Sequence, residues 1–343
     1  MRLLVLLSGE HPTLPRSEVL AALEALGMRF KIAEEAEQVL VLEGDFKREE
    51  VAKLAERVAM AHYFGELCFS CEASHEEVLS SARRADYSFD GSFAVRVHRV
   101  RHHAEHLSTE RLEREIGAII ASQDKKVNLS APENLITGII SDRFYLARVL
   151  ARVERSAYEE RRPHLRPYFR PGVLLPRLAR AVVNLTRVRP GERFADPFCG
   201  TGGILIEAGL VGAEVYGFDL EEEFLSGAEL NLRHYGIERY HLSHGDARTL
   251  WERYQEYFHA IACDPPYGIS ASTKGLSLER LYKESLASIC RMLMPRRYAC
   301  VLGPSEVDIE GYASSAGFGI EEVHFERVHR SLVRKIVVLR KWR

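Results

Sequence analysis

The second half of the chain alternates short apolar runs with longer segments in which apolar residues recur at helical spacing. Runs that fit buried strands occupy residues 192–198, 214–219, 240–245, 259–264 and 298–303. A parallel sheet covered by helices on both faces produces this alternation, so we predict an α/β fold with a doubly wound, mostly parallel, Rossmann-like sheet. The chain ends differently, because EEVHFERVHRSL and VRKIVVLRKW follow each other with no helix between them. This ending predicts an antiparallel pair of strands at the C-terminus.

The first half has shorter and more mixed elements. We expect strands at 2–9, 38–45 and 92–101 and helices at 15–27, 47–61 and 109–121. Pro15 suits the first turn of a helix, and Ser108 or Thr109 suits a helix cap. We therefore divide the chain into a ferredoxin-like α/β unit (1–60), a second α/β unit (61–154), an arginine-rich linker (155–170) and a C-terminal domain (171–343).

Composition limits the class of protein. The chain has 343 residues, of which 46% are hydrophobic and 28% are charged, as in a soluble globular protein of two or three domains. No apolar run approaches the roughly 18 to 20 residues of a membrane span. The apolar start LLVLLSGEHP fits a strand better than a signal peptide. We therefore expect a cytoplasmic protein.

The cysteines give little support to a metal site. Six are scattered along the chain, and the close pair Cys68 and Cys71 has neither a second cysteine pair nor a well-spaced histidine pair to complete a zinc site. We expect these two side chains to pack structurally, or to form a disulfide if the source is a hyperthermophile. We expect no metal.

The net charge of −2 conceals a basic stretch. Between Arg152 and Arg170, arginines are interleaved with Tyr158, Tyr168 and Phe169. Arginine binds phosphate and stacks on bases, and aromatic rings stack too, so the stretch fits nucleic-acid binding. Its prolines fit a solvated interdomain linker equally well. The RNA-binding candidates are Arg161, Arg162 and Arg166 in this stretch and Arg96, Arg99 and Arg101 in the strand at 92–101.

Four of the expected strands lead into an aspartate, namely Asp196, Asp219, Asp246 and Asp264. A single aspartate there is usually a turn or cap residue, but the carboxyl ends of parallel strands line one ligand crevice. Asp196 opens the stretch DPFCGTGG, which lacks the GxGxxG phosphate pattern; its carboxylate would repel phosphate and suit an ammonium or sulfonium group. Asp219 could bind ribose hydroxyls, and Asp246 could accept a hydrogen bond from an adenine amino group.

The stretch IACDPPYGIS stops a strand abruptly. Pro265 and Pro266 lack the N–H that a sheet ladder needs, so the strand ends at Asp264. An X-Pro pair also favours extended geometry in the preceding residue, which fixes the directions of Asp264 and Pro265. A carboxylate, a backbone carbonyl and the ring of Tyr267 are thereby held in one small patch. The prolines alone favour a simple turn over a catalytic site.

Together these motifs resemble the class I S-adenosylmethionine methyltransferases that modify exocyclic amino groups. DPFCGTGG matches their cofactor loop, DPPY their catalytic motif, and FRPG at 169–172 the segment that precedes the cofactor loop in their RNA branch. SFAVRVHRVRHH, the helix after it and KVNLSAPEN resemble a THUMP domain, a module of tRNA-modifying enzymes. In this order, the parts resemble the tRNA guanine N2-methyltransferases that act at position 10.

The resemblance implies S-adenosylmethionine as cofactor and tRNA as substrate. It also implies that a base swung out of the tRNA helix stacks on Tyr267, while Asp264 and the Pro265 carbonyl hold its amino group. The catalytic candidates are Asp264, Pro265, Pro266 and Tyr267. The cofactor-binding candidates are Asp196, Pro197, Phe198, Cys199, Gly200, Thr201, Gly202, Asp219, Leu220, Asp246, Ala247, Phe169 and Gly172.

Other functions share these features. A DNA amino-methyltransferase would keep the same catalytic motifs and use the N-terminal half for target recognition. An enzyme acting on ribosomal RNA or another tRNA position fits the patterns as well, whereas the intact DPPY and glycine loop argue against a non-catalytic tRNA-binding protein. We expect a monomer. The sequence leaves open whether one methyl group or two are added and whether a small activator subunit is required.

Overall fold

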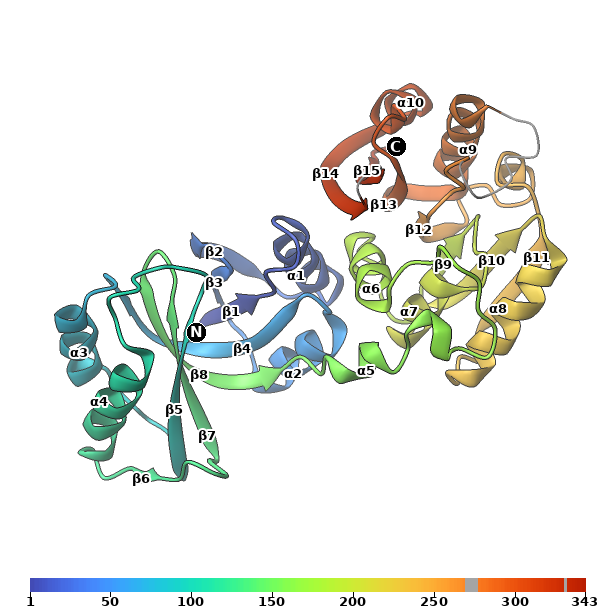
Figure 1. Cartoon of the computed structure of the whole chain (residues 1–343). Helices are drawn as coiled ribbons and strands as arrows, with labels where there is room; N and C mark the ends of the chain where they lie inside the picture. Colours follow the sequence, from blue (N-terminus) through green and yellow to red (C-terminus); the bar gives the residue numbers. More distant parts are fainter. Residues whose placement is uncertain (269–276, 330–331) are drawn as a thin grey trace. The chain divides into compact units, whose positions relative to one another are not determined.

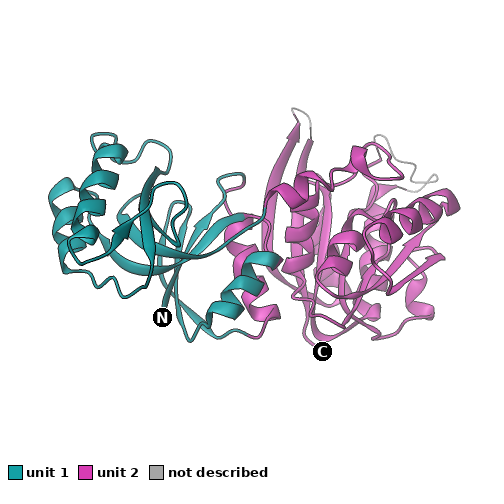
Figure 2. Ribbon diagram, turned by 90° about the horizontal axis from the view of Figure 1, so that it is seen from below, with its two compact units in different colours: residues 1–10, 28–56, 61–154 teal, residues 11–27, 57–60, 155–343 magenta. Residues whose placement is uncertain are grey.

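The computed structural model describes residues 1–268, 277–329 and 332–343. The chain forms two compact units that interleave along the sequence (Figure 2). Unit 1 contains residues 1–10, 28–56 and 61–154, and unit 2 contains residues 11–27, 57–60 and 155–343. No helix in the described part of the chain is long and apolar enough to span a membrane.

Unit 1, all of which is described, is built on one mixed sheet in the order β2-β3-β1-β4-β8-β7-β5-β6 (Figure 1). Its strands are β1 (Arg2–Leu7), β2 (Phe30–Ala36), β3 (Val39–Gly44), β4 (Ala61–Cys71), β5 (Ser92–Arg99), β6 (Lys126–Val127), β7 (Asn134–Ile140) and β8 (Phe144–Arg152). The helices are α2 (Arg48–Arg57), α3 (His75–Arg84) and α4 (Thr109–Ala121). β5 pairs in parallel with β6 and β7, and the other neighbours are antiparallel.

Several predicted elements of unit 1 are confirmed. β1, β3, β5, α2 and α4 occupy the expected segments, and the Ser108 hydroxyl caps α4 by accepting a hydrogen bond from the Arg111 backbone N–H at 3.2 Å. The sequence patterns missed β2, β4 and α3. β2 lies at the edge of the sheet and has the acidic sequence FKIAEEA, so it shows no apolar run. β4 mixes polar and apolar residues although it lies between β1 and β8.

The cysteine pair lies on β4. Cys71 is buried in a core cluster with Val78 and Phe144, and Cys68 packs against the same cluster. Both thiols are free, and burial raises the pKa of each above its usual value. The predicted structural packing of these side chains is therefore present.

In the described part of unit 2, the sheet has the strand order β11-β10-β9-β12-β13-β15-β14 (Figure 1). Its strands are β9 (Arg193–Asp196), β10 (Glu214–Asp219), β11 (Tyr240–His244), β12 (Phe258–Cys263), β13 (Leu293–Pro304), β14 (Phe318–His329) and β15 (Leu332–Lys341). β9 to β13 pair in parallel, and β15 pairs antiparallel with β13 and β14. The predicted α/β class, parallel sheet and terminal antiparallel pair are confirmed.

Helices cover both faces of this sheet. The described part of unit 2 contains the helices α1 (Leu14–Ala25), α5 (Ser156–Glu159), α6 (Pro176–Leu185), α7 (Gly203–Leu210), α8 (Glu222–His234), α9 (Leu278–Met292) and α10 (Ile309–Ala316), with short 3-10 turns at Pro163–Leu165 and Leu250–Glu252. Ala299 and Val301 of β13 share a core cluster with residues of α9 and α10. Because side chains alternate along a strand, Cys300 and Leu302 face the opposite side, where β13 contacts α6.

Helix α1 belongs to unit 2 although its sequence lies near the N-terminus. It packs on α6, and its Glu18 side chain is completely buried. The Glu18 carboxylate accepts hydrogen bonds from the backbone N–H groups of Ala59 and Met60, at 2.9 and 2.7 Å, and from Asn184 Nδ2 at 2.9 Å. This carboxylate therefore links α1, the segment 57–60 and α6 inside one folded unit.

Candidate active site

Three of the four predicted aspartates lie at the carboxyl ends of three adjacent parallel strands. Asp196 ends β9, Asp219 ends β10, and Asp264 follows the last residue of β12. β9 pairs with both β10 and β12, so the three strand ends are neighbours. Asp196 is only 1% exposed. Burial first, and then the charges of Asp219 and Asp264, raise its pKa well above the ordinary value. This edge of unit 2 therefore gathers carboxyl groups that oppose one another's ionisation, and a positive charge placed beside them would favour their ionised forms.

The loop after β9 is held in place by these same carboxylates. Asp196 Oδ1 accepts a hydrogen bond from the Phe198 N–H at 3.0 Å, and Asp219 Oδ2 accepts one from the Gly200 N–H at 2.9 Å. Gly202 has a φ of +81°, and a Cβ at this position would lie 3.3 Å from the Cβ of Ala228 in α8. Glycine is therefore required where the loop turns into α7.

The FRPG segment lies beside this loop. Asn231 of α8 bridges the two, because its Oδ1 accepts the Tyr168 N–H at 3.0 Å and its Nδ2 donates to the Thr201 carbonyl at 2.9 Å. Phe169 is 45% exposed, and Gly172 has a φ of +89°. The structure thus ties Tyr168, the residue before the FRPG segment, to the predicted loop through Asn231, which the sequence patterns did not single out.

Asp246 follows β11, which pairs in parallel with β10, so it lies at the same edge. Its carboxylate already has a partner that the sequence analysis missed. Arg248 Nε donates to both carboxylate oxygens, at 3.0 and 3.1 Å, and Arg248 Nη1 lies 3.2 Å from Glu284 Oε2. The neighbouring Ala247 is buried, and Leu220 follows Asp219 directly. Arg248 fixes the direction of the Asp246 carboxylate and uses part of its accepting capacity.

The strand before the DPPY stretch ends one residue earlier than predicted, directly before Asp264. β12 ends at Cys263, and Pro265 follows Asp264 as a buried residue. The Tyr267 hydroxyl donates to Asp264 Oδ1 at 2.5 Å, and Arg334 Nε of β15 donates to the Tyr267 oxygen at 2.7 Å. Burial raises the pKa of Asp264, while Arg334 and the bond from Tyr267 oppose that rise. Arg334 was not among the predicted site residues.

The predicted RNA-binding arginines have very different surroundings. Arg161 donates to the fully buried Glu207 of α7, and Arg166 is only 5% exposed, so neither offers its guanidinium to solvent. This position argues against phosphate binding by these two side chains. In unit 1, Arg99 donates to the backbone carbonyls of residues 103, 104 and 107 and so supports a turn. The candidates with half or more of the side chain exposed are Arg101, paired with Glu37, and Arg162, paired with Glu159.

Arg96 is partly buried and donates to the carbonyls of Val95 and Leu129. The basic stretch between Arg152 and Arg170 is a solvated linker only in part, because two of its residues are bonded to helices of unit 2. Its first half is anchored on α7 through Arg161, and its second half lies against α8 through Tyr168.

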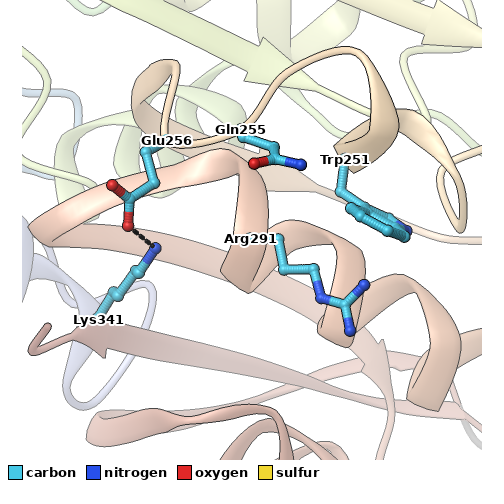
Figure 3. Close-up of a pocket in the computed structure, with 5 residues that line it drawn as sticks. All are labelled: Trp251, Gln255, Glu256, Arg291 and Lys341. Carbon is cyan, nitrogen blue, oxygen red and sulfur yellow. Dashed lines mark hydrogen bonds and ion pairs between the residues drawn. The ribbon is translucent and has the colours of Figure 1, made fainter.

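A separate pocket of about 540 Å³ is lined by Trp251, Gln255, Glu256, Arg291 and Lys341 (Figure 3). Glu256 precedes β12 and Lys341 ends the antiparallel β15, so this pocket lies at the amino ends of the parallel strands. Lys341 Nζ donates to Glu256 Oε1 at 2.9 Å, and the Arg291 guanidinium lies 4.2 Å from the Trp251 ring centroid. The four aspartates lie at the opposite edge of the sheet, and no predicted site residue lines this pocket.

Comparison with known proteins agrees with this geometry. The RMKL-like methyltransferase domain family matches residues 163–336. The tRNA (guanine(10)-N2)-dimethyltransferase of Methanothermobacter thermautotrophicus is 41% identical over 99% of this chain and 100% of its own length. The chain belongs to this methyltransferase family. The tRNA (guanine(10)-N2)-dimethyltransferase of Pyrococcus abyssi, another member, is 35% identical over 96% of this chain and 97% of its own length.

A solved structure supports the fold of this family member. TrmN from Thermus thermophilus aligns with a TM-score of 0.57 over 99% of this chain and 100% of TrmN, at 23% sequence identity. The α/β architecture and the assignment as a methyltransferase, both predicted from the sequence, are confirmed.

Proposed function

We propose that this protein transfers methyl groups from S-adenosylmethionine to the N2 amino group of guanosine 10 in tRNA. The observation that carries the proposal is the partly buried Asp264 carboxylate at the carboxyl edge of the sheet, in a chain whose full-length relatives are tRNA (guanine(10)-N2)-dimethyltransferases. S-adenosylmethionine would supply an electrophilic methyl group on a positively charged sulfur. Asp196, Asp219 and Asp264 lie at one edge of the sheet, where burial and mutual repulsion oppose the ionisation of Asp196, and such a positive charge would stabilise the ionised carboxylates.

Asp264 and Pro265 are the proposed acceptors for the amino group. The nitrogen lone pair of guanine is delocalised into the ring, so the site has to orient this nitrogen toward the methyl group. The Asp264 carboxylate and the Pro265 carbonyl would accept hydrogen bonds from the two amino protons. Attack makes the nitrogen cationic and acidic, and one proton can then leave to Asp264 or to water. Most of the rate acceleration would come from holding the two reactants in line.

Tyr267 and Pro266 form the proposed contact surface for the base. A paired guanine cannot present its amino group, so the base must leave the tRNA helix and enter the site. The Tyr267 ring is fixed by its hydroxyl, which bonds to Asp264 on one side and to Arg334 on the other. This ring would stack on the flipped base.

The cofactor-binding residues take separate parts of S-adenosylmethionine. Asp219 would bind the ribose hydroxyls, and Asp246 with Ala247 and Leu220 would face the adenine. The loop from Pro197 to Gly202 would hold the methionine end, with Phe169 and Gly172 beside it. The backbone of this loop supports the assignment, because the Asp196 and Asp219 carboxylates accept hydrogen bonds from it and fix its direction.

Replacing Asp219 by alanine should weaken the binding of S-adenosylmethionine by about 1 to 3 kcal/mol. The variant loses the ribose acceptor and also frees the Gly200 N–H, which donates to Asp219 Oδ2. Isothermal titration calorimetry measures the change. Asp45→Ala, which removes an exposed carboxylate from unit 1, is the matched control and should bind as the wild type does. Equal affinities for the two variants would remove Asp219 from the site.

We propose that residues 61–154 act as a THUMP domain that holds tRNA, with Arg101 and Arg162 as phosphate contacts. Arg101→Ala should weaken tRNA binding and reduce the slope of log affinity against log salt concentration by about 1. Binding measured at several salt concentrations tests this. Arg2→Ala removes a similarly exposed, paired arginine that lies outside residues 61–154 and should leave the slope unchanged. Identical slopes for both variants would contradict a phosphate contact at Arg101.

Mass spectrometry of nucleosides tests the proposed function. Purified protein, S-adenosylmethionine and a tRNA transcript should give N2-methylguanosine or N2,N2-dimethylguanosine, and a transcript with adenosine at position 10 should give neither. Methylation of ribosomal RNA or duplex DNA in preference to tRNA would overturn the proposal. The same assay shows whether one methyl group or two are added and whether the purified chain is active without a small activator subunit. We propose that the chain acts as a monomer. The reaction would take place in the cytoplasm.

A further inference from the structure

A chain of hydrogen bonds links the terminal strand pair to the catalytic aspartate. Arg334 of β15 donates from Nε to the Tyr267 oxygen at 2.7 Å, and the Tyr267 hydroxyl donates to Asp264 Oδ1 at 2.5 Å. Arg334 pairs in register with Pro304, the last residue of β13, so it reaches the carboxyl edge because β15 runs opposite to the parallel strands. A charged side chain from the end of the sequence thereby enters the site formed after β12.

The Arg334 guanidinium contacts more than one acidic group. It is only 8% exposed. Its Nη1 donates to Glu326 Oε2 of β14 at 2.8 Å, and its Nη2 lies 3.9 Å from Asp264 Oδ2. The guanidinium carbon also lies 5.7 Å from the Tyr267 ring centroid. Because guanidinium is planar and its donors are fixed in direction, the ion pair with Glu326 sets how the remaining N–H groups meet Tyr267 and Asp264.

We propose that Arg334 is a positioning residue of the methyl-transfer site, which holds the Tyr267 ring and the Asp264 carboxylate in the arrangement that receives the base. The proposal rests on the proposed function of Asp264 and Tyr267. Arg334 acts through two routes, the hydrogen bond to the Tyr267 oxygen and the positive charge next to Asp264. Tyr267 therefore keeps a fixed hydroxyl partner even when an incoming amino group takes over the bond to Asp264 Oδ1.

The charged and titratable groups that face Asp264 set the direction of the expected pH effect. They are Tyr267 on its own loop, Arg334 on β15, Glu326 on β14, Asp196 on β9 and Tyr282 on α9. Burial and Glu326 raise the pKa of Asp264, whereas Arg334 and Tyr267 lower it. Loss of Arg334 should therefore raise this pKa further. Activity that needs the ionised carboxylate would then begin to fall at a higher pH than in the wild type.

Lys335 provides a matched control on the same strand. It is buried like Arg334, and its Nζ donates to Glu310 Oε2 of α10 at 2.7 Å. Because side chains alternate along a strand, Lys335 faces α10 on the other side of the sheet from Arg334. Lys335→Gln removes a buried, paired cation but leaves Asp264, Tyr267 and Arg334 unchanged. Its effect on the rate therefore measures the loss of a buried positive charge from this strand by itself.

The test compares single-turnover methyl transfer across pH for wild type, Arg334→Gln, Arg334→Lys and Lys335→Gln, at saturating cofactor and tRNA. Arg334→Gln should slow transfer roughly 10- to 100-fold, which corresponds to the loss of one or two charge-assisted hydrogen bonds. In the plot of rate against pH, the fall in rate on the acidic side should begin at a higher pH than in the wild type. Arg334→Lys keeps the positive charge but not the planar set of donors. Its pH dependence should therefore be close to that of the wild type, while its rate stays lower. Lys335→Gln should change neither. Equal effects of Arg334→Gln and Lys335→Gln, with no shift of the pH at which the rate falls, would overturn the proposal.

A double-mutant cycle with Tyr267→Phe separates the two routes. If Arg334 acts through the hydroxyl, its replacement should cost much less in the Tyr267→Phe background than in the wild type. Full additivity of the two losses would refute that route.

A readout without turnover keeps this test distinct from the proposed function. The pKa of Asp264 can be followed by carbon NMR of aspartate-labelled protein, with the resonance assigned by its absence in Asp264→Asn. A higher pKa of Asp264 in Arg334→Gln than in wild type supports the role of Arg334, whether or not the wild type methylates tRNA. Absence of tRNA methylation by the wild type would contradict the proposed function alone. An unchanged pKa together with an unchanged rate would reject the role of Arg334.

Discussion

Replacing Asp264 by alanine is expected to slow methyl transfer to tRNA by roughly 1,000-fold or more, while cofactor and tRNA affinities stay within a few-fold of wild type. The carboxylate lies at the carboxyl edge of the sheet, 18% exposed, with its Oδ1 oriented by the Tyr267 hydroxyl. Its bond to the amino group becomes strongest as the nitrogen turns cationic, so the loss should appear in the chemical step. Single-turnover rates at saturating cofactor and tRNA measure that step without interference from product release.

Asp264→Asn is the sharper comparison. Asparagine keeps one carbonyl acceptor in nearly the same place but loses the negative charge that offsets the forming cation, so we expect a loss of about 10- to 1,000-fold. Asp45→Asn, an exposed site of unit 1 outside residues 61–154, is the control and should retain the wild-type rate. Wild-type rates for both Asp264 variants would show that Asp264 has no catalytic role and that the two prolines after it form an ordinary turn.

The sequence predicts the parallel half of unit 2 well because the deciding signals there are local. β10 occupies the expected residues 214–219, and β12 stops where Pro265 and Pro266 require it to stop. The shared edge of Asp196, Asp219 and Asp264 follows from parallel pairing, which the alternation of strands and helices already indicates. Local composition and spacing are therefore sufficient to predict the sheet and the shared edge at which these aspartates lie.

The contacts that the sequence does not predict join residues far apart in the chain. Arg334 reaches Tyr267 across 67 positions, through the register of β15 on β13, and no local pattern specifies that register. The one available signal is a pair of charges, Arg334 and Lys335, inside the apolar run of β15. Likewise, α1 packs in unit 2 through Glu18 and Asn184, which are 166 positions apart.

The interleaving of the two units also changes how the protein should be divided for experiments. A fragment that starts near residue 170 would lack α1 and the segment 57–60, which unit 2 contains. It would expose the face of α6 that α1 covers and leave Asn184 without the Glu18 carboxylate. Full-length variants are therefore preferable to such a fragment for measuring cofactor and tRNA affinity.

Glu207→Ala is expected to lower the free energy of unfolding by about 3 to 5 kcal/mol. Glu207 of α7 is fully buried and accepts Arg161 Nε at 2.9 Å and Arg180 Nη2 at 2.8 Å. Both guanidiniums also lie near the Tyr158 ring, at 4.6 and 5.6 Å from its centroid. Removal of the carboxylate leaves two largely buried cations facing each other with no anion between them. It also releases the linker from the helix that follows the proposed cofactor loop.

Thermal and urea unfolding measure this loss, and a change of 3 to 5 kcal/mol corresponds to a fall in Tm of roughly 6 to 20 °C for a unit of this size. Glu229→Ala breaks an exposed i,i+4 pair with Arg233 on α8 and should change the stability by less than about 0.5 kcal/mol. Adding Arg161→Met to Glu207→Ala should recover part of the loss, since one of the two stranded charges is then removed. If Glu207→Ala unfolded like Glu229→Ala, the carboxylate would not anchor the linker, and Arg161 would again be a candidate for tRNA binding.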